Sequence, residues 1–188
     1  MIRRAALGGV IGPTAFIGAW SVLGATRADY SPIHDAISRL AELGSHTRPY
    51  MTAGFVTFGV AVPIYSRALR AALPGRAWVG AAVTGVATLG VAAFPLGGSA
   101  TVERLHGVCA AIGYASLSAV PLTAAARFRG DGRSTAARWS VASGAVAAVC
   151  LVATTAGPAH GFFQRAGLAA GDTWLMISAL MIMRTGTL

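Results

Sequence analysis

The sequence has little charge, no lysine or asparagine, and only two cysteines. Of its 188 residues, 11% are charged and 55% are hydrophobic, whereas soluble domains average about 25% charged residues. Each cysteine, Cys109 and Cys150, lies within a long apolar stretch, which argues against a disulfide framework. The composition therefore argues against a soluble domain and indicates an integral membrane protein.

All fifteen basic residues are arginine, and Gln164 is the only glutamine. Lysine and asparagine codons are rich in A and T, so their absence indicates a genome of high GC content, and we expect a bacterial source. The preference for arginine then reflects codon usage rather than a need for bidentate hydrogen bonding.

Six apolar stretches lie between the charged positions. Each is close to the ~20 residues that a helix needs to cross a bilayer core of about 30 Å. The first is too long for the apolar part of a signal peptide, so we expect it to be retained. We predict one domain over residues 1–188, an all-α polytopic membrane protein with six transmembrane helices. The predicted helices cover residues 5–26, 49–66, 77–94, 105–126, 139–156 and 164–183.

The net charge of +9 would suggest nucleic-acid binding in a soluble protein, but its distribution indicates a topology instead. The N-terminus, the second and fourth connections and the C-terminus together hold ten arginines and one acid. The opposite face holds five arginines and five acids. By the positive-inside rule, both termini lie in the cytoplasm and the protein lies in the bacterial plasma membrane. We expect membrane lipids as partners and no nucleic acid.

The longest connection, about residues 27–48, lies on the predicted outer face. Ser31 can cap a helix, Pro32 suits its first position and Gly44 suits its end. We therefore predict a short interfacial helix after the first transmembrane helix. Its apolar stripe would face lipid or the mouth of the bundle. The segment is either a lid over an outward-facing cavity or a connector packed on the bundle. The predicted stripe consists of Ile33, Ile37, Leu40 and Leu43.

The same face holds all four histidines and five of the six acids. The spacing of Pro32, His34 and Arg39 recurs in Pro158, His160 and Arg165. Arginines with neighbouring histidines would suit an anionic headgroup or phosphate. The alternative is that loops in water simply carry polar residues. The candidate binding residues are Arg104, His106, Gln164, Arg165, Ser38 and His34.

Asp172 interrupts the last apolar stretch. Twelve residues separate it from Arg184, about 18 Å of helix rise, which places it inside the apolar slab. An acid there needs a partner, a wet cavity or a proton, and we expect Arg165 or Arg104 to be its partner. If the helix starts late, Asp172 lies among the headgroups instead. The candidate catalytic residues are Asp172, Glu103 and His106.

Metal and cofactor sites have little support in the sequence. No His-Glu-x-x-His pattern and no paired cysteine spacing occurs, and only His106 is expected on a helix where it could ligate haem. No glycine-rich nucleotide loop occurs either. We expect no metal and no cofactor.

Three short motifs together resemble a known family. They are Asp29-Tyr30-Ser31-Pro32 followed by Ile37-Ser38-Arg39-Leu40 and Gly44; Phe94-Pro95 followed by His106-Gly107; and Gly161-Phe162-Phe163-Gln164-Arg165 with Trp174. This pattern resembles the bacterial membrane family described as domain of unknown function 998. The resemblance implies six helices and a plasma-membrane location, and brings no settled activity. Asp172 does not belong to the family pattern.

Three functions remain open, because fold alone does not give function. The first is a non-enzymatic membrane protein that binds a lipid or partner at its outer face, or serves in a larger assembly. The second is a membrane-embedded enzyme that uses a carboxylic acid on a lipid or isoprenoid substrate. The third is a small transporter, although the two halves show no clear similarity. Whether the protein is an enzyme stays open.

Overall fold

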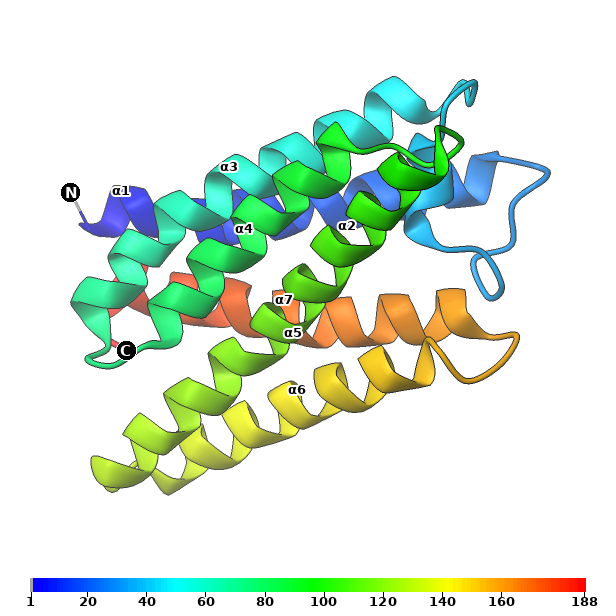
Figure 1. Ribbon diagram of the computed structural model, residues 1–188. Helices are drawn as coiled ribbons and strands as arrows, with labels where there is room; N and C mark the ends of the chain where they lie inside the picture. The colour runs from blue at the N-terminus through cyan, green and yellow to red at the C-terminus, as the bar shows by residue number, and fades with distance from the viewer. Residues whose placement is uncertain (1) are drawn as a thin grey trace.

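The computed structural model describes residues 2–188, which form a bundle of helices without a strand (Figure 1). One short 3-10 helix, η1, lies in the longest connection. The elements are α1 (Ile2–Ala6), α2 (Gly8–Thr26), η1 (Ile37–Ala41), α3 (Arg48–Ala72), α4 (Ala77–Ala93), α5 (Ala100–Gly130), α6 (Ser134–Ala153) and α7 (His160–Thr185).

The predicted helices are present, but most are longer than their apolar stretches. Helices α3 and α5 continue through arginines at their C-terminal ends, as at Arg70 and Arg127. An arginine side chain can keep its stem on apolar surface while the charged head reaches water, so a charge ends the apolar stretch without ending the helix. At the other end of α5, the Ser99 side chain accepts a hydrogen bond from the Val102 amide and starts the helix earlier than predicted.

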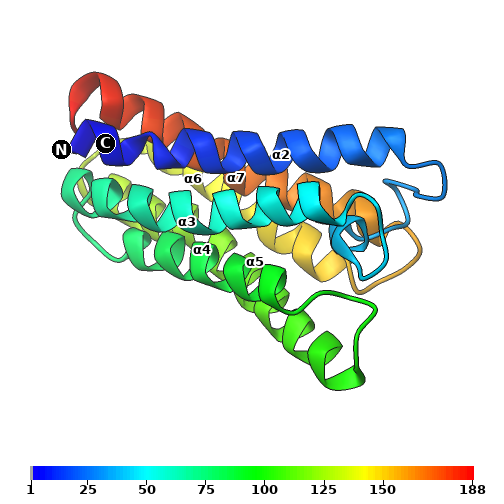
Figure 2. The same ribbon diagram turned by 90° about the horizontal axis from the view of Figure 1, so that it is seen from above.

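Helix α3 lies between α2 and α4 (Figure 2). One face of it is buried along its whole length, with spacings of four and three residues that repeat over several turns, as expected for a helix stripe. The α3 stripe packs on α2, α4 and α7. It consists of Met51, Phe55, Phe58, Val62, Tyr65 and Leu69.

Small residues let the helices approach closely. A Cβ added at Gly12 would lie 3.2 Å from the Ala61 Cβ, so α2 packs directly on α3. The pattern Gly8-x-x-x-Gly12 is therefore a packing motif within this chain. Gly59 and Gly85 form the matching approach between α3 and α4: a Cβ at either would lie 3.1 Å from the carbonyl oxygen of the other. In lipid, where apolar burial does not drive association, such contacts hold helices together.

The two ends of the bundle differ in charge. Both termini lie at one end, together with the α3–α4 and α5–α6 turns (Figures 1 and 2). This arginine-rich end carries the ten arginines and one acid counted above. The opposite end, called the loop end, carries the connection of residues 27–47 (the long loop) and the turns of residues 94–99 and 154–159.

Four helical segments are long and apolar enough to cross a membrane: Ile2–Thr26, Ala100–Gly130, Ser134–Ala153 and His160–Thr185. Helix α4 is apolar but has 17 residues. Large apolar side chains also point outward around the bundle, such as Val86 at 62% exposure and Val152 at 68%. A soluble monomer rarely exposes a wide apolar belt, so the surface is of the membrane type.

The predicted interfacial helix from Ser31 to Gly44 is wrong in extent. Only Ile37–Ala41 are helical, as one 3-10 segment, and the residues before them form turns. The expected stripe is split, because Ile37 and Leu40 are buried whereas Ile33 and Leu43 are exposed. The cause lies in the tertiary structure. Groups of α7 form hydrogen bonds with backbone amides and carbonyls of this segment, which in a regular helix would have bonded to each other.

Candidate functional site

The long loop is fastened to the start of α7 by hydrogen bonds that the sequence alone does not show. The Phe162 amide, one of the free amides of the first helical turn, donates to the Ile33 carbonyl at 3.0 Å. The Arg165 guanidinium donates through Nη1 to the carbonyls of Pro32 at 2.8 Å and Asp35 at 3.0 Å. A charged donor to carbonyls makes a strong hydrogen bond, so Arg165 holds the loop down.

Gly161 permits this close approach. A Cβ at this position would lie 2.9 Å from the Pro32 carbonyl oxygen. The loop backbone therefore lies directly on the first turn of α7, and any side chain at residue 161 would push it away. The second copy of the proline–histidine spacing takes part as well, because the His34 Nδ1–H donates to the Pro158 carbonyl at 2.7 Å.

His106 fastens η1 to α5. Its Nδ1 lies 2.7 Å from the Phe94 carbonyl and its Nε2 lies 2.9 Å from the Ser38 hydroxyl. A carbonyl only accepts, so Nδ1 carries the proton, and in the neutral ring Nε2 accepts from Ser38. Both side chains are buried. Two of the predicted binding residues thus bind each other.

Gln164 connects three elements. Its Oε1 accepts a hydrogen bond from the Ile37 amide at 2.7 Å, and its Nε2 donates to the Tyr114 hydroxyl. The only glutamine of the chain therefore joins η1, α7 and α5.

Arg27 organises the rest of the long loop from inside. It forms ion pairs of 2.9 Å with both Asp29 and Glu42 and donates to the Arg39 carbonyl at 2.7 Å. The hydrogen bonds from Arg27 hold the pKa of Asp29 below its usual value. Burial raises the pKa of the Tyr30 phenol, although Arg165 donates a hydrogen bond to it.

The side chains of the remaining predicted residues make no hydrogen bond to His106, Gln164 or Arg165. Arg104 is exposed and makes no hydrogen bond or ion pair with any of residues 2–188. Glu103 is exposed and accepts from the Gly97 amide at 3.1 Å, which closes the turn before α5. Arg39 pairs with Asp35 at 3.2 Å on the surface. Of the two arginines predicted to bind a ligand, Arg165 is bonded to the long loop and only Arg104 is exposed without a side-chain partner among residues 2–188.

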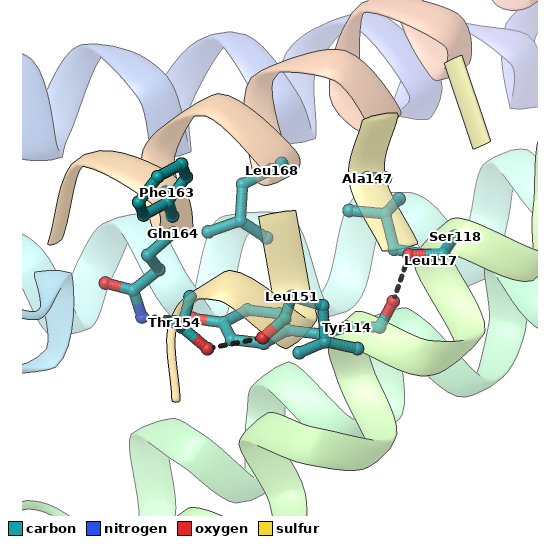
Figure 3. A pocket seen from close by; sticks show the side chains of 10 residues that line it. Tyr114, Leu117, Ser118, Ala147, Leu151, Thr154, Phe163, Gln164 and Leu168 are labelled. Atoms are coloured by element: carbon teal, nitrogen blue, oxygen red, sulfur yellow. Dashed lines mark hydrogen bonds between the residues drawn. The ribbon is translucent and has the colours of Figure 1, made fainter. Parts of the chain in front are cut away.

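Two small cavities share four lining residues, and only the inner one is lined by η1, through Ile37 and Ser38. The inner cavity, about 40 Å³, lies between α2, α3, α4, α5 and α7. The side cleft, about 10 Å³, lies between α5, α6 and α7 (Figure 3). The inner cavity has room for a water molecule, whereas the side cleft is at the lower limit. The shared residues are Tyr114, Leu117, Gln164 and Leu168.

The hydrogen bond between Gln164 and Tyr114 stands where the two cavities meet (Figure 3). The inner cavity is lined by apolar side chains and by neutral polar ones, and no charged residue lines it. Its polar lining residues are Ser38, Thr84, Thr88, Tyr114 and Gln164. Within residues 2–188, no group of three or more His, Cys, Asp or Glu side chains is placed to hold a metal ion.

Asp172 is fully buried in α7, and the prediction of an arginine partner for it is wrong. Neither carboxyl oxygen has a hydrogen-bond partner among residues 2–188. Arg165, the expected partner, donates to backbone carbonyls and Tyr30 instead. An ionised carboxylate without a partner would be very costly in such surroundings, so the neutral acid is the form that this position supports. Asp172 does not line either cavity.

The sequence analysis missed Tyr114 and Tyr30. Tyr114 lies in the apolar stretch of α5, and no sequence pattern around it marks a site. The one hint in the sequence is Gln164, the only glutamine, which donates a hydrogen bond to the Tyr114 hydroxyl. Tyr30 was part of a motif, but its hydroxyl contacts with Asp35, Ala36 and Arg165 depend on how the loop folds back.

The fold and the site define a helical bundle of the membrane type with a folded loop closing one end. The chain belongs to the family described as Protein of unknown function (DUF998), whose model matches residues 10–181. The resemblance in the sequence is thereby confirmed. No curated protein and no solved structure gives a significant match to the chain.

Proposed function

We propose that this chain is a bacterial plasma-membrane protein with six transmembrane helices and both termini in the cytoplasm, and that it binds a neutral lipid or isoprenoid beneath the long loop. The charge asymmetry supports the orientation: the arginine-rich end carries a net charge of +9 and the loop end a net charge of zero. The long loop then lies outside the cell. Helices α3 and α4 complete the six spans because they are packed between helices that are long enough to cross.

The observation that carries the binding proposal is that the long loop closes the inner cavity, which it lines through Ile37 and Ser38. His106, Gln164 and Arg165 each hold a different part of the long loop. In this closed arrangement the inner cavity has room for water only. A ligand of lipid size enters when the loop lifts and the contact between Gln164 and Tyr114 separates, which joins the two cavities.

The chemistry of the lining favours a neutral polar headgroup. Hydroxyl and amide groups line the inner cavity. The Arg165 guanidinium is hydrogen-bonded to the loop backbone, and Arg104 is exposed. A phosphate would enter a low-dielectric space without a free cation to pair with it, which is costly. A hydroxyl or carbonyl headgroup with an apolar tail matches this lining.

The orientation is tested by cysteine accessibility. Thr101→Cys at the loop end and Ser134→Cys at the arginine-rich end are both at exposed positions. With an impermeant thiol reagent added to whole cells, we expect Thr101→Cys to react and Ser134→Cys to react only after lysis. The unmodified chain, with Cys109 and Cys150, gives the background. Labelling of Ser134→Cys alone in whole cells would refute the orientation.

Binding is tested by the thermal stability of the purified protein in detergent, because a ligand that binds the folded state raises Tm. The probes are farnesol, monoolein and farnesyl phosphate. We expect farnesol or monoolein to raise Tm more than the phosphate. Ala110→Leu should abolish the shift, since Ala110 lines the inner cavity, whereas the neighbouring Ala111→Leu should retain it, since Ala111 is exposed. An equal shift in both variants, a larger shift with the phosphate that Ala110→Leu removes, or no shift with either neutral probe would refute the proposal.

A further inference from the structure

A cavity much larger than the two near the long loop lies far from that loop. It is a groove of about 850 Å³ between the α5–α6 hairpin and α7, within the range of roughly 300–1,000 Å³ typical of sites for small ligands. The hairpin diverges from α7 toward the end of the bundle that holds the termini (Figure 1). The groove lining includes Phe128, Arg133, Trp139, Val146, Ile177 and Met181.

The groove is largely apolar, and several of its polar groups are bonded to protein partners. The Trp174 indole N–H donates to the Ser140 hydroxyl at 2.9 Å, and the Ser143 hydroxyl donates to the Ala170 carbonyl at 2.8 Å. Both bonds also tie α6 to α7 along the groove. Large apolar side chains are left exposed beside them: Trp139 is 73% exposed and Ile177 is 55% exposed.

A single cation stands at the end of the groove. Arg133 lies with its guanidinium 4.8 Å from the Phe128 ring centroid and has no acidic partner among residues 2–188. The nearby acid, Asp131, pairs with Arg127 at 2.8 Å. Arg133 is therefore free to bind an anion at the mouth of an apolar groove.

The length of the groove matches one leaflet. Along α6 its lining residues run from Thr135 to Val146, about 17 Å at 1.5 Å per residue. That is roughly half of a hydrocarbon core of about 30 Å. A helix of a second copy would be expected to follow the whole thickness, whereas one lipid molecule fills one leaflet from its headgroup inward.

We propose that this groove binds an acidic phospholipid, with an acyl chain along α6 and α7 and the phosphate at Arg133. The site is separate from the cavities beneath the long loop and does not rest on binding there. The proposed orientation assigns the lipid to the inner leaflet, but recognition of its headgroup and chain does not depend on that orientation.

Native mass spectrometry of the detergent-purified protein tests this proposal, because it counts bound lipids and protein copies together. The probes are dioleoyl phosphatidylglycerol and dioleoyl phosphatidylcholine at equal concentration. We expect one phosphatidylglycerol molecule to bind preferentially. Arg133→Gln should weaken its binding about fivefold, the usual effect of one arginine near an acidic headgroup, and Arg76→Gln, at an exposed arginine of the same end, should not.

A second pair of variants tests the position of the acyl chain. Ala142→Phe fills the groove, and Ala145→Phe places the same side chain on α6 outside the groove lining, with both alanines exposed. We expect only Ala142→Phe to lower binding of both lipids. Equal binding of the two lipids, no effect of Arg133→Gln and Ala142→Phe, or a dimer that carries no lipid would overturn the proposal. A retained Tm in each variant shows that the bundle is folded.

Discussion

Replacement of Arg165 by methionine should release the long loop from α7. Methionine keeps an unbranched apolar stem against the rings of Trp20 and Tyr30, over which the guanidinium lies at 5.4 Å in each case. The substitution removes every hydrogen bond that the Arg165 side chain donates to the long loop. The carbonyls of Pro32 and Asp35 then lose their donor.

The expected magnitude follows from the hydrogen bonds that are lost. Nη1 carries two protons that are shared among the carbonyls of Pro32, Asp35 and Gly161. A hydrogen bond to a charged group contributes about 1.5–3 kcal/mol. Two bonds at the lower value give about 3 kcal/mol, which makes opening of the loop roughly a hundredfold more frequent.

Hydrogen exchange in nanodiscs measures this opening directly. The informative amides are those of Ile37 and Phe162, because both are bonded across the contact between the loop and α7. We expect both to lose about two orders of magnitude of protection in Arg165→Met, while the amides of α3 keep theirs. Arg104→Met removes an exposed arginine of the same end and should change nothing. Unchanged protection in Arg165→Met, or equal loss in both variants, would refute the role assigned to Arg165.

Three further results are expected. Asp172→Leu should raise the Tm of the detergent-solubilised protein, because it removes two buried oxygens without partners, a cost of about 1–3 kcal/mol; a fall in Tm would contradict this. Ser38→Ala should lower protection of η1 by about 1 kcal/mol, because His106 loses the donor to its Nε2, and unchanged exchange of η1 would argue against that bond. Because Arg27 lowers the pKa of Asp29 in the folded loop, the stability from this pair is present above the ordinary pKa of 3.8 and is lost as the pH falls further. Protection of the loop should then vary with pH through this pair only in acid, and a change in protection between pH 5 and 7 would require another titrating group.

The position of the helices was predictable because helix formation in an apolar chain depends on local composition. The apolar stretches predicted the long helices, but their ends differed, as where α5 begins at Ala100 and ends at Gly130. The first predicted helix is also divided at Leu7 into α1 and α2. Short motifs also carried the family resemblance, and the family model confirms the family by matching residues 10–181. The long loop was less predictable: a helix from Ser31 to Gly44 satisfied the local rules, but bonds to α7 replaced it by turns and η1.

The partners of the polar residues were decided by the tertiary structure alone. Ser38 and His106 are 68 residues apart, and Pro32 and Arg165 are 133 apart, so no local pattern relates them. The sequence by itself determined that the chain forms apolar helices with an uneven distribution of arginine. Packing of α7 under the long loop determined that Arg165 bonds to the loop backbone while Asp172 stays without a partner. The physical reason is that periodicity fixes which face of a helix is apolar, whereas a hydrogen bond also needs the distance and angle between two helices, which only the folded bundle sets.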